Sequence, residues 1–338
     1  MDEIVATLTM LLVHVPSFVL AGLLLLGGLW FFAFTSGVRR FHTDPSAGRV
    51  RAFQRELMRR DNPAFGILVG GYAVGLGVAM SGTLFGLGED PWQMLQAVLG
   101  LGVAAALLMR ISVILNDKAI LFRFSNLKEI VQDRHKGVAF VMAGHCLATG
   151  LILSGAFSGD TPPGSADALP RWLIGLRDVV VYWLVGQAVL IAGGRAFCLV
   201  AGYKVQQMLA EQDSPAIGVA MGGMLAAQGI IAKASLNGAS GNLGAEVLVT
   251  LVLASVGVAL LSTAGLIFRL IFGRRQVHEI VRDKNAAAGV VMAAIFVVIA
   301  LLAAGAISAS VASAQARAAR AFEPPPYSAP ATGANVAP

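Results

Sequence analysis

Residues 61–86 read DNPAFGILVGGYAVGLGVAMSGTLFG, an Asp-x-Pro-Ala start followed by an apolar run in which glycine recurs every few positions. Residues 213–238 read DSPAIGVAMGGMLAAQGIIAKASLNG, with the same start, a second Gly-Gly pair, and Lys233 at the position of Ser81. A helix needs about 20 apolar residues to cross the hydrocarbon core of a bilayer. The two stretches therefore predict repeated membrane helices lined with glycine.

The composition of the whole chain is typical of a membrane protein. Of its 338 residues, 57% are apolar and 13% are charged, whereas a soluble globular chain has about 25% charged residues. The mean hydropathy is +0.74. The Lys and Arg behind the net charge of +6 lie between the apolar runs, where they set topology, so we expect no nucleic-acid partner. Neither cysteine lies in a metal-binding or disulfide motif, so we expect no metal and no cofactor.

The hydropathy pattern predicts an all-α integral membrane protein with eight spans. They cover residues 6–36, 64–86, 92–116, 138–158, 173–198, 215–237, 245–270 and 287–310. The N-terminal sequence MDEIVATLTM lacks the basic region of a signal peptide, so the first run is expected to stay as a span. The tail 311–338 is rich in Ala and Pro and is predicted to be disordered.

Basic residues alternate between the two sides of the predicted bundle. The connections 39–62, 117–137, 199–214 and 269–285 contain most of the Lys and Arg, whereas the three opposite connections contain only Arg171. The positive-inside rule then places the basic connections in the cytoplasm and both termini outside, in a bacterial inner membrane. The segments VRAFQRELMRR, FSNLKEIVQDR, KVQQMLAEQD and RRQVHEIVRD have apolar residues three and four apart. They are predicted to be short amphipathic helices that continue a span or lie on the membrane face.

Pairs of small residues recur in every second predicted span. They are Gly70-Gly71, Ala143-Gly144, Gly222-Gly223 and Ala293-Ala294, followed at constant spacing by Gly82, Gly155, Ala234 and Gly305. The pattern predicts four parallel two-helix repeats in two four-helix halves, 1–170 and 171–310. Small residues let helix backbones approach closely, so these glycines are predicted to pack helices. A glycine-lined pathway for ions or small solutes is the alternative.

These motifs resemble the YjfL-type family of bacterial inner-membrane proteins, a family of unknown function whose unit has two such repeats in four spans. The resemblance rests on DNPAFGILVGGYAVGLGVAMSGTLFG and HEIVRDKNAAAGVVMAAIFVVIALLAAGAIS, and it would cover most of residues 1–310 as two tandem units. It implies no catalytic residue and no substrate. Members of the family tend to be encoded near phage-shock-type membrane-stress proteins and ATP-grasp ligases, which implies a link to envelope stress or polyamine chemistry.

Charged residues inside predicted spans are costly and often functional. Arg177 and Asp178 are adjacent in the fifth span, and because neighbouring helix positions point about 100° apart, they are not expected to pair with each other. Lys233 lies at a similar depth in the sixth span, so an ion pair between Asp178 and Lys233 is predicted. A lysine exposed at the interface and a transport or ligand site are the alternatives.

Uncharged polar residues also lie inside spans. His145 in the fourth span is expected either to hydrogen-bond a neighbouring helix or to take part in a proton relay. Gln187 and Gln228 are expected to hydrogen-bond across helices. The sequence has no paired carboxylates and no nucleophile motif where they would work, so we do not expect an enzyme.

Two functions are compatible with this sequence. In the first, basic cytoplasmic helices of a scaffold or membrane-stress protein bind anionic lipid or a cytoplasmic partner, although the same charges would also serve topology alone. The residues concerned are Arg51, Arg55, Arg59 and Arg60. In the second, the protein is a channel or transporter for ions or polyamine-type solutes, lined by Lys233, Asp178 and His145. Besides the lipid bilayer, further copies of the chain are an expected partner.

Overall fold

The computed structural model describes residues 2–41, 48–58, 60–85, 91–158, 171–202, 204–236, 243–282 and 285–321. Within these ranges, side chains are described except at 2–11, 85, 171–174, 272–282 and 314–321. Arg59 lies outside the described residues, as does the end of the tail from 322 to 338.

The described part of the chain contains eight helices that are long and apolar enough to span a membrane. They are α1 (Asp2–Thr35), α3 (Pro63–Phe85), α4 (Pro91–Leu115), α6 (Lys136–Phe157), α7 (Arg171–Ala201), α9 (Pro215–Ser235), α10 (Leu243–Arg282) and α11 (Ala286–Ala321). The short elements between them are η1 (Val38–Phe41), α2 (Arg49–Met58), η2 (Asn116–Ile120), α5 (Asn126–Val131) and α8 (Val205–Gln212). The predicted all-α fold with eight such helices is confirmed.

Two helices extend beyond their predicted ends. The segment RRQVHEIVRD continues α10 to Arg282, so the basic residues near 275 extend a long helix. In the same way α11 continues past residue 310 to Ala321, within the predicted disordered tail. The added segment VASAQARAARA is mostly alanine, the residue with the highest helix propensity. The helix stops shortly before Pro324, which would break it.

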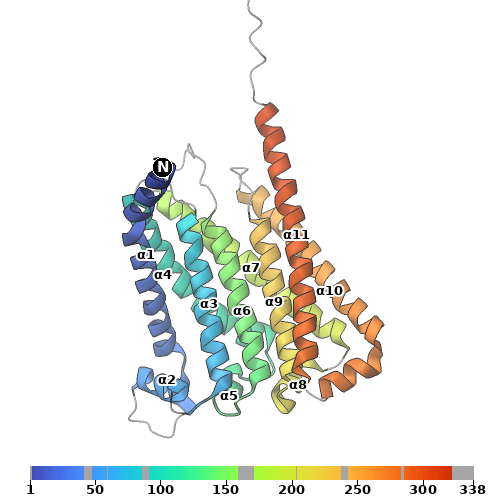
Figure 1. The fold of residues 1–338 in the computed structure, drawn as a ribbon. Coiled ribbons are helices and arrows are strands. Elements are labelled where there is room, and N and C mark those ends of the chain that lie inside the picture. Colours follow the sequence, from blue (N-terminus) through green and yellow to red (C-terminus); the bar gives the residue numbers. More distant parts are fainter. Residues whose placement is uncertain are drawn as a thin grey trace, which may run out of the picture.

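The spanning helices form two layers (Figure 1). In one layer α3, α6, α9 and α11 stand in a row, and each packs closely on the next. In the other layer α4 contacts both α3 and α6, α7 contacts α6 and α9, and α10 contacts α9 and α11. The short helices η1, α2, α5 and α8 all lie at one end of the bundle, which we call the basic end (bottom of Figure 1).

The first three helices of the row, α3, α6 and α9, begin with the same backbone turn. Asp61, Arg134 and Asp213 are the non-glycine residues with positive φ among the described residues, at 44°, 60° and 44°. Each lies two residues before the start of α3, α6 or α9. At α3 the Asn62 side chain caps the helix, because its Oδ1 accepts a hydrogen bond from the Phe65 amide at 3.1 Å. The Asp-x-Pro-Ala motif therefore marks a tight reversal followed by a helix start.

Small residues lie wherever two helices of the row meet. A Cβ atom added at Gly71 would lie 2.4 Å from the Ala143 Cβ, one at Gly144 would lie 2.2 Å from the Gly222 carbonyl oxygen, and one at Gly223 would lie 2.3 Å from the Ala293 Cβ. At the other end of these junctions, Gly82 faces Ser154 and Gly155 faces Lys233. Distances this short leave no room for a larger side chain, so the predicted packing glycines at these positions touch a neighbouring helix.

Gly70 and Gly305 differ from the other glycines that we predicted to pack helices. Apart from the neighbouring backbone of its own helix, no heavy atom of the described chain lies within 4 Å of a Cβ placed at either position. Gly70 lies on the side of α3 that faces away from α6, and Gly305 lies on an exposed side of α11. These two residues therefore have no packing role within the described part of one chain.

Candidate functional site

A seam of buried polar side chains lies between α4, α6 and α7. His145 on α6 is fully buried, and its Nε2 lies 3.1 Å from the Ser112 carbonyl oxygen on α4. Because a carbonyl only accepts hydrogen bonds, Nε2 carries the proton. The Trp183 indole of α7 donates to the Ser112 hydroxyl at 2.8 Å. One turn further along α6 and α7, the Gln187 amide donates to the Thr149 hydroxyl at 3.2 Å.

The seam continues toward the basic end through two asparagines. Asn116 follows Ser112 by one helical turn, and the Asn126 amide of α5 donates to the Asn116 Oδ1 at 3.3 Å. Four buried atoms of the seam have no hydrogen-bond partner among the described residues: His145 Nδ1, Gln187 Oε1, Asn116 Nδ2 and Asn126 Oδ1. Since buried polar atoms are nearly always paired, the seam has the chemistry to hold water or a small polar ligand.

Sequence reasoning found His145 and Gln187 but missed their partners. The partners are Ser112, Asn116, Asn126, Thr149 and Trp183. A signal was present, because three helices each place two polar residues four positions apart, at 112 and 116, 145 and 149, and 183 and 187. Such spacing puts both residues on one face of a helix.

The structure does not bring Asp178 and Lys233 together. The Arg177 Nε lies 2.8 Å from the Asp178 Oδ1, so the two adjacent residues do pair, contrary to our expectation. The flexible arginine stem compensates for the 100° between the two positions. Both side chains are partly exposed, at 47% and 27%, and such surface pairs add little stability. The Lys233 ammonium instead donates to the Ser154 hydroxyl of α6 at 3.1 Å.

Gln228 differs from Gln187 because it forms no hydrogen bond to another helix within the described part of the chain. Its amide lies 3.7 Å from the Met224 sulfur one turn earlier in α9, and its Oε1 is buried without a hydrogen-bond partner. The side chain lies directly against Gly193 of α7, where a Cβ would overlap it. A larger residue at position 193 would therefore require the end of the Gln228 side chain to move.

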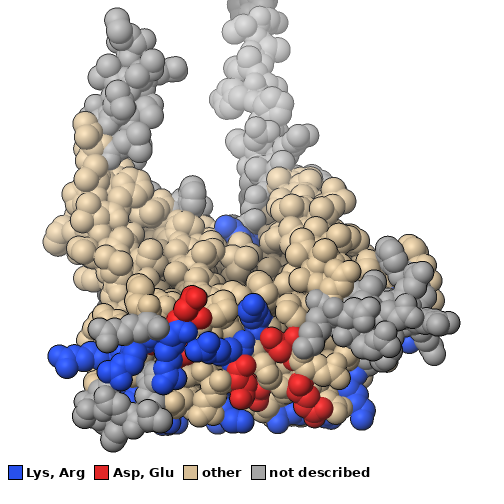
Figure 2. Space-filling view, turned by 60° about the horizontal axis from the view of Figure 1, so that its bottom comes forward, with Lys and Arg blue, Asp and Glu red and all other residues tan. Residues whose placement is uncertain are grey.

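Lysine and arginine gather at the basic end, with a few acidic residues between them (Figure 2). On α2, Arg51 is exposed, whereas Arg55 is half-buried. Glu56 is fully buried; it accepts a hydrogen bond from the Asn62 amide at 2.8 Å and lies 3.7 Å from the Arg60 guanidinium. Arg60 is thus partly neutralised, while Arg51 presents its full charge to the surroundings.

A pocket lies at the basic end of α1, and we call it the arginine pocket. It has a volume of about 500 Å³ and is lined by Ala33, Phe34, Thr35, Gly37, Val38, Arg39, Arg40 and Arg49. The Arg49 guanidinium lies 4.7 Å from the centre of the Phe34 ring. A fourth arginine, Arg110, donates to the Thr35 carbonyl and hydroxyl, both at 2.8 Å. Three arginines therefore line the pocket, and none of them is among the four that we assigned to lipid contact from the sequence.

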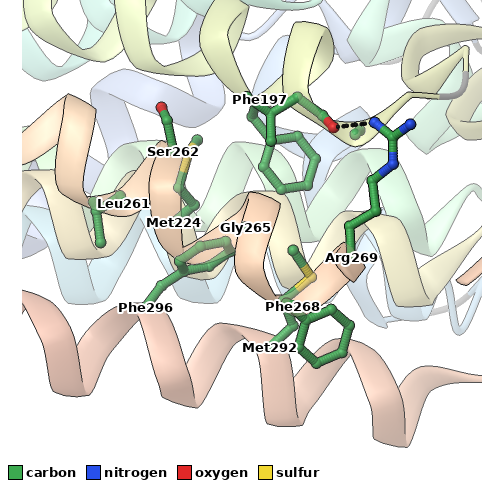
Figure 3. Close-up of a pocket in the computed structure, with 11 residues that line it drawn as sticks. Phe197, Met224, Leu261, Ser262, Gly265, Phe268, Arg269, Met292 and Phe296 are labelled. Carbon is green, nitrogen blue, oxygen red and sulfur yellow. Dashed lines mark hydrogen bonds between the residues drawn. The ribbon is translucent and has the colours of Figure 1, made fainter. Parts of the chain in front are cut away.

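A second cavity lies in the second half of the chain, between α7, α9, α10 and α11 (Figure 3). Its volume is about 30 Å³, and apolar side chains such as Phe197, Met224 and Phe296 line it. Arg269 lies at its edge and donates to the Val200 carbonyl at 2.9 Å. A cavity of this size holds about one water molecule, so it is too small for a polyamine.

The eight apolar helices and the collection of basic residues at one end define a polytopic helical membrane protein. The family described as Domain of Unknown Function (DUF350) matches residues 5–157 and again residues 171–307. The chain belongs to this family and contains two of its units in tandem, as the motifs predicted. No curated protein and no solved structure matches the chain.

Proposed function

We propose that the protein is a membrane scaffold whose basic end binds the headgroups of anionic phospholipids. The observation that supports this most directly is the arginine pocket, in which Arg39, Arg40 and Arg49 surround a space of about 500 Å³. Guanidinium groups bind phosphate oxygens through paired, charge-assisted hydrogen bonds. A pocket of this size accommodates a lipid headgroup.

The position of the pocket also fits a lipid ligand. Trp30 and Phe34 stack on each other in the last turns of α1, with their ring centres 5.6 Å apart. They are 58% and 41% exposed. Exposed aromatic residues are typical of the level of the headgroups in a membrane. Arg39 and Arg40 follow α1 within about two turns, and the Arg49 guanidinium lies against the Phe34 ring, at the level where a lipid phosphate would lie. A scaffold of this kind is compatible with the membrane-stress role that the family resemblance implies.

Lipid binding to a charge-reduced variant tests the proposal. In the triple variant Arg39→Gln, Arg40→Gln, Arg49→Gln, phosphatidylglycerol should bind on the order of a hundredfold more weakly, since each basic residue contributes about 1 kcal/mol. The measurement is a titration of the protein in zwitterionic nanodiscs with labelled phosphatidylglycerol, at low and at high salt. The matched control Arg123→Gln, Lys128→Gln, Lys204→Gln removes three charges from the same end but outside the pocket.

The control should retain most of the lipid affinity. Equal losses in both triple variants would show that the whole basic end acts as a diffuse charge, without a headgroup site. Binding that does not weaken with salt would contradict an electrostatic contact altogether.

The buried polar seam favours a second candidate function, the passage of protons or another small cation. Its four unpaired polar atoms extend from α5 near the basic end to the middle of α6 and α7. Proton flux into liposomes containing the purified protein should then fall in the variants His145→Phe and Thr149→Val. The control Ser262→Ala changes a polar residue of the second half, away from the seam. If liposomes that contain the unmodified protein show the same proton flux as empty liposomes, this candidate function is eliminated.

A further inference from the structure

The three junctions within the row of helices use the same two faces. We call the face that packs on the preceding helix the leading face, and the face that packs on the following helix the trailing face. On the leading face of α9, Gly218, Gly222 and Gly229 contact α6. A Cβ at any of them would lie within 2.5 Å of an α6 backbone atom. On the leading face of α6, Gly150 contacts the Gly75 carbonyl of α3 in the same way.

The first helix of the row has the same leading face, and no described part of the chain packs on its glycines. In the sequence alignment of the row, Gly66, Gly70 and Gly77 of α3 correspond to Gly218, Gly222 and Gly229 of α9. Apart from the neighbouring backbone of α3 itself, no described heavy atom lies within 4 Å of a Cβ at any of these three positions. Val74, between them, is 57% exposed. The leading face, with which α6, α9 and α11 each pack on the preceding helix, is therefore also present in α3. There the described residues leave it uncovered.

The last helix of the row has an uncovered trailing face. Ala294 and Gly305 of α11 correspond to Gly71 and Gly82, which in α3 contact α6. Ala294 and Gly305 are both exposed, and Val298 between them is 54% exposed. The row therefore has an open leading face on α3 and an open trailing face on α11. In each of the three junctions within the row, a trailing face packs on a leading face.

We propose that copies of the chain assemble head to tail in the membrane, with the trailing face of α11 in one copy packed on the leading face of α3 in the next. The new junction would continue the interface already formed between α3 and α6, between α6 and α9, and between α9 and α11. Close backbone approach at small residues is what drives helix association in lipid. Because the two faces differ, the contact is heterologous, and repetition gives a closed ring or an extended row.

Leucine substitutions on the two faces test the assembly without disturbing the single chain. Gly70→Leu and Gly305→Leu each add a side chain where the chain itself leaves open space, so monomer stability should be unchanged. Two copies with different affinity tags are co-expressed, extracted with a styrene–maleic acid copolymer, and purified through one tag. The unmodified copies should co-purify, whereas two Gly70→Leu copies or two Gly305→Leu copies should not.

The decisive sample combines a Gly70→Leu copy with a Gly305→Leu copy. The first retains an intact trailing face and the second an intact leading face, so this pair should co-purify through a single junction. The control Gly100→Leu on α4, also in open space, should leave co-purification intact. Loss only for Gly70→Leu, or only for Gly305→Leu, would show a self-complementary contact and overturn the proposal. Failure of the unmodified copies to co-purify would overturn it as well.

Discussion

At the scale of single residues, Lys233 shows how the chain accommodates a charge near a helix end. It replaces a small polar residue, since Ser81 and Ser154 occupy the corresponding positions of α3 and α6. The Ser81 hydroxyl donates to the Val78 carbonyl of its own helix at 2.7 Å. Ser154 instead accepts a hydrogen bond from Lys233. The Lys233 ammonium therefore hydrogen-bonds the residue at the corresponding position of the adjacent helix, and not the Asp178 carboxylate that we predicted.

A double-mutant cycle between Lys233→Met and Ser154→Ala measures this contact. We expect a coupling free energy of about 0.6 kcal/mol, and less than 2 kcal/mol, as is usual for hydrogen bonds between membrane helices. Unfolding in mixed micelles of mild detergent and dodecyl sulfate gives the free energies. The control cycle pairs Lys233→Met with Ser81→Ala, where the effects should add. Additive effects in the first cycle as well would mean that the two side chains do not interact.

At the scale of helices, the two members of each small-residue pair have different tasks. Gly71 contacts the next helix of the row, whereas Gly70 faces away from it. Neighbouring residues of one helix therefore differ in their tolerance of a side chain. Alanine already occupies the position corresponding to Gly70 in α6 and α11, as Ala143 and Ala293.

The substitutions Gly71→Ala and Gly70→Ala should separate these tasks. Gly71→Ala should destabilise the protein by roughly 1–3 kcal/mol, because the added methyl group meets Ala143 and forces the helices apart. Gly70→Ala should leave stability unchanged or raise it by up to about 1 kcal/mol, since alanine favours a helix more than glycine does. Both are measured by the same unfolding assay, and equal effects would contradict the packing of α3 on α6.

At the scale of the whole molecule, the basic residues define one end of the bundle. All the short helices between spans lie there (Figure 1), and Lys and Arg gather on that surface (Figure 2). An arrangement of this kind is expected to face the cytoplasm, because positively charged connections are retained there during insertion.

Reporter fusions test this orientation. Alkaline phosphatase fused after residue 165 should be active, because the ends of α6 and α7 that flank this site lie away from the basic end, whereas a fusion after residue 125 should be inactive. Green fluorescent protein at the same two sites should give the opposite result. An active phosphatase at 125 would reverse the proposed orientation of the protein in the membrane.

The sequence alone determined the class of protein, the eight spans and the connections that bear positive charge. These follow from local properties, since the length of an apolar run and the charges at its ends need no knowledge of neighbouring helices. It also determined that Gly71, Gly144 and Gly223 would contact other helices, because glycine at regular spacing has few other uses in lipid.

Only the tertiary structure decided which groups meet. Lys233 reaches Ser154 and Arg177 reaches Asp178, because the direction of a long side chain depends on the helices around it. The same holds for the seam around His145 and for the arginine pocket, whose residues come from separate segments of the chain. Gly70 and Gly71 look alike in the sequence, and only the order of the helices in the row shows that one is covered and the other is open.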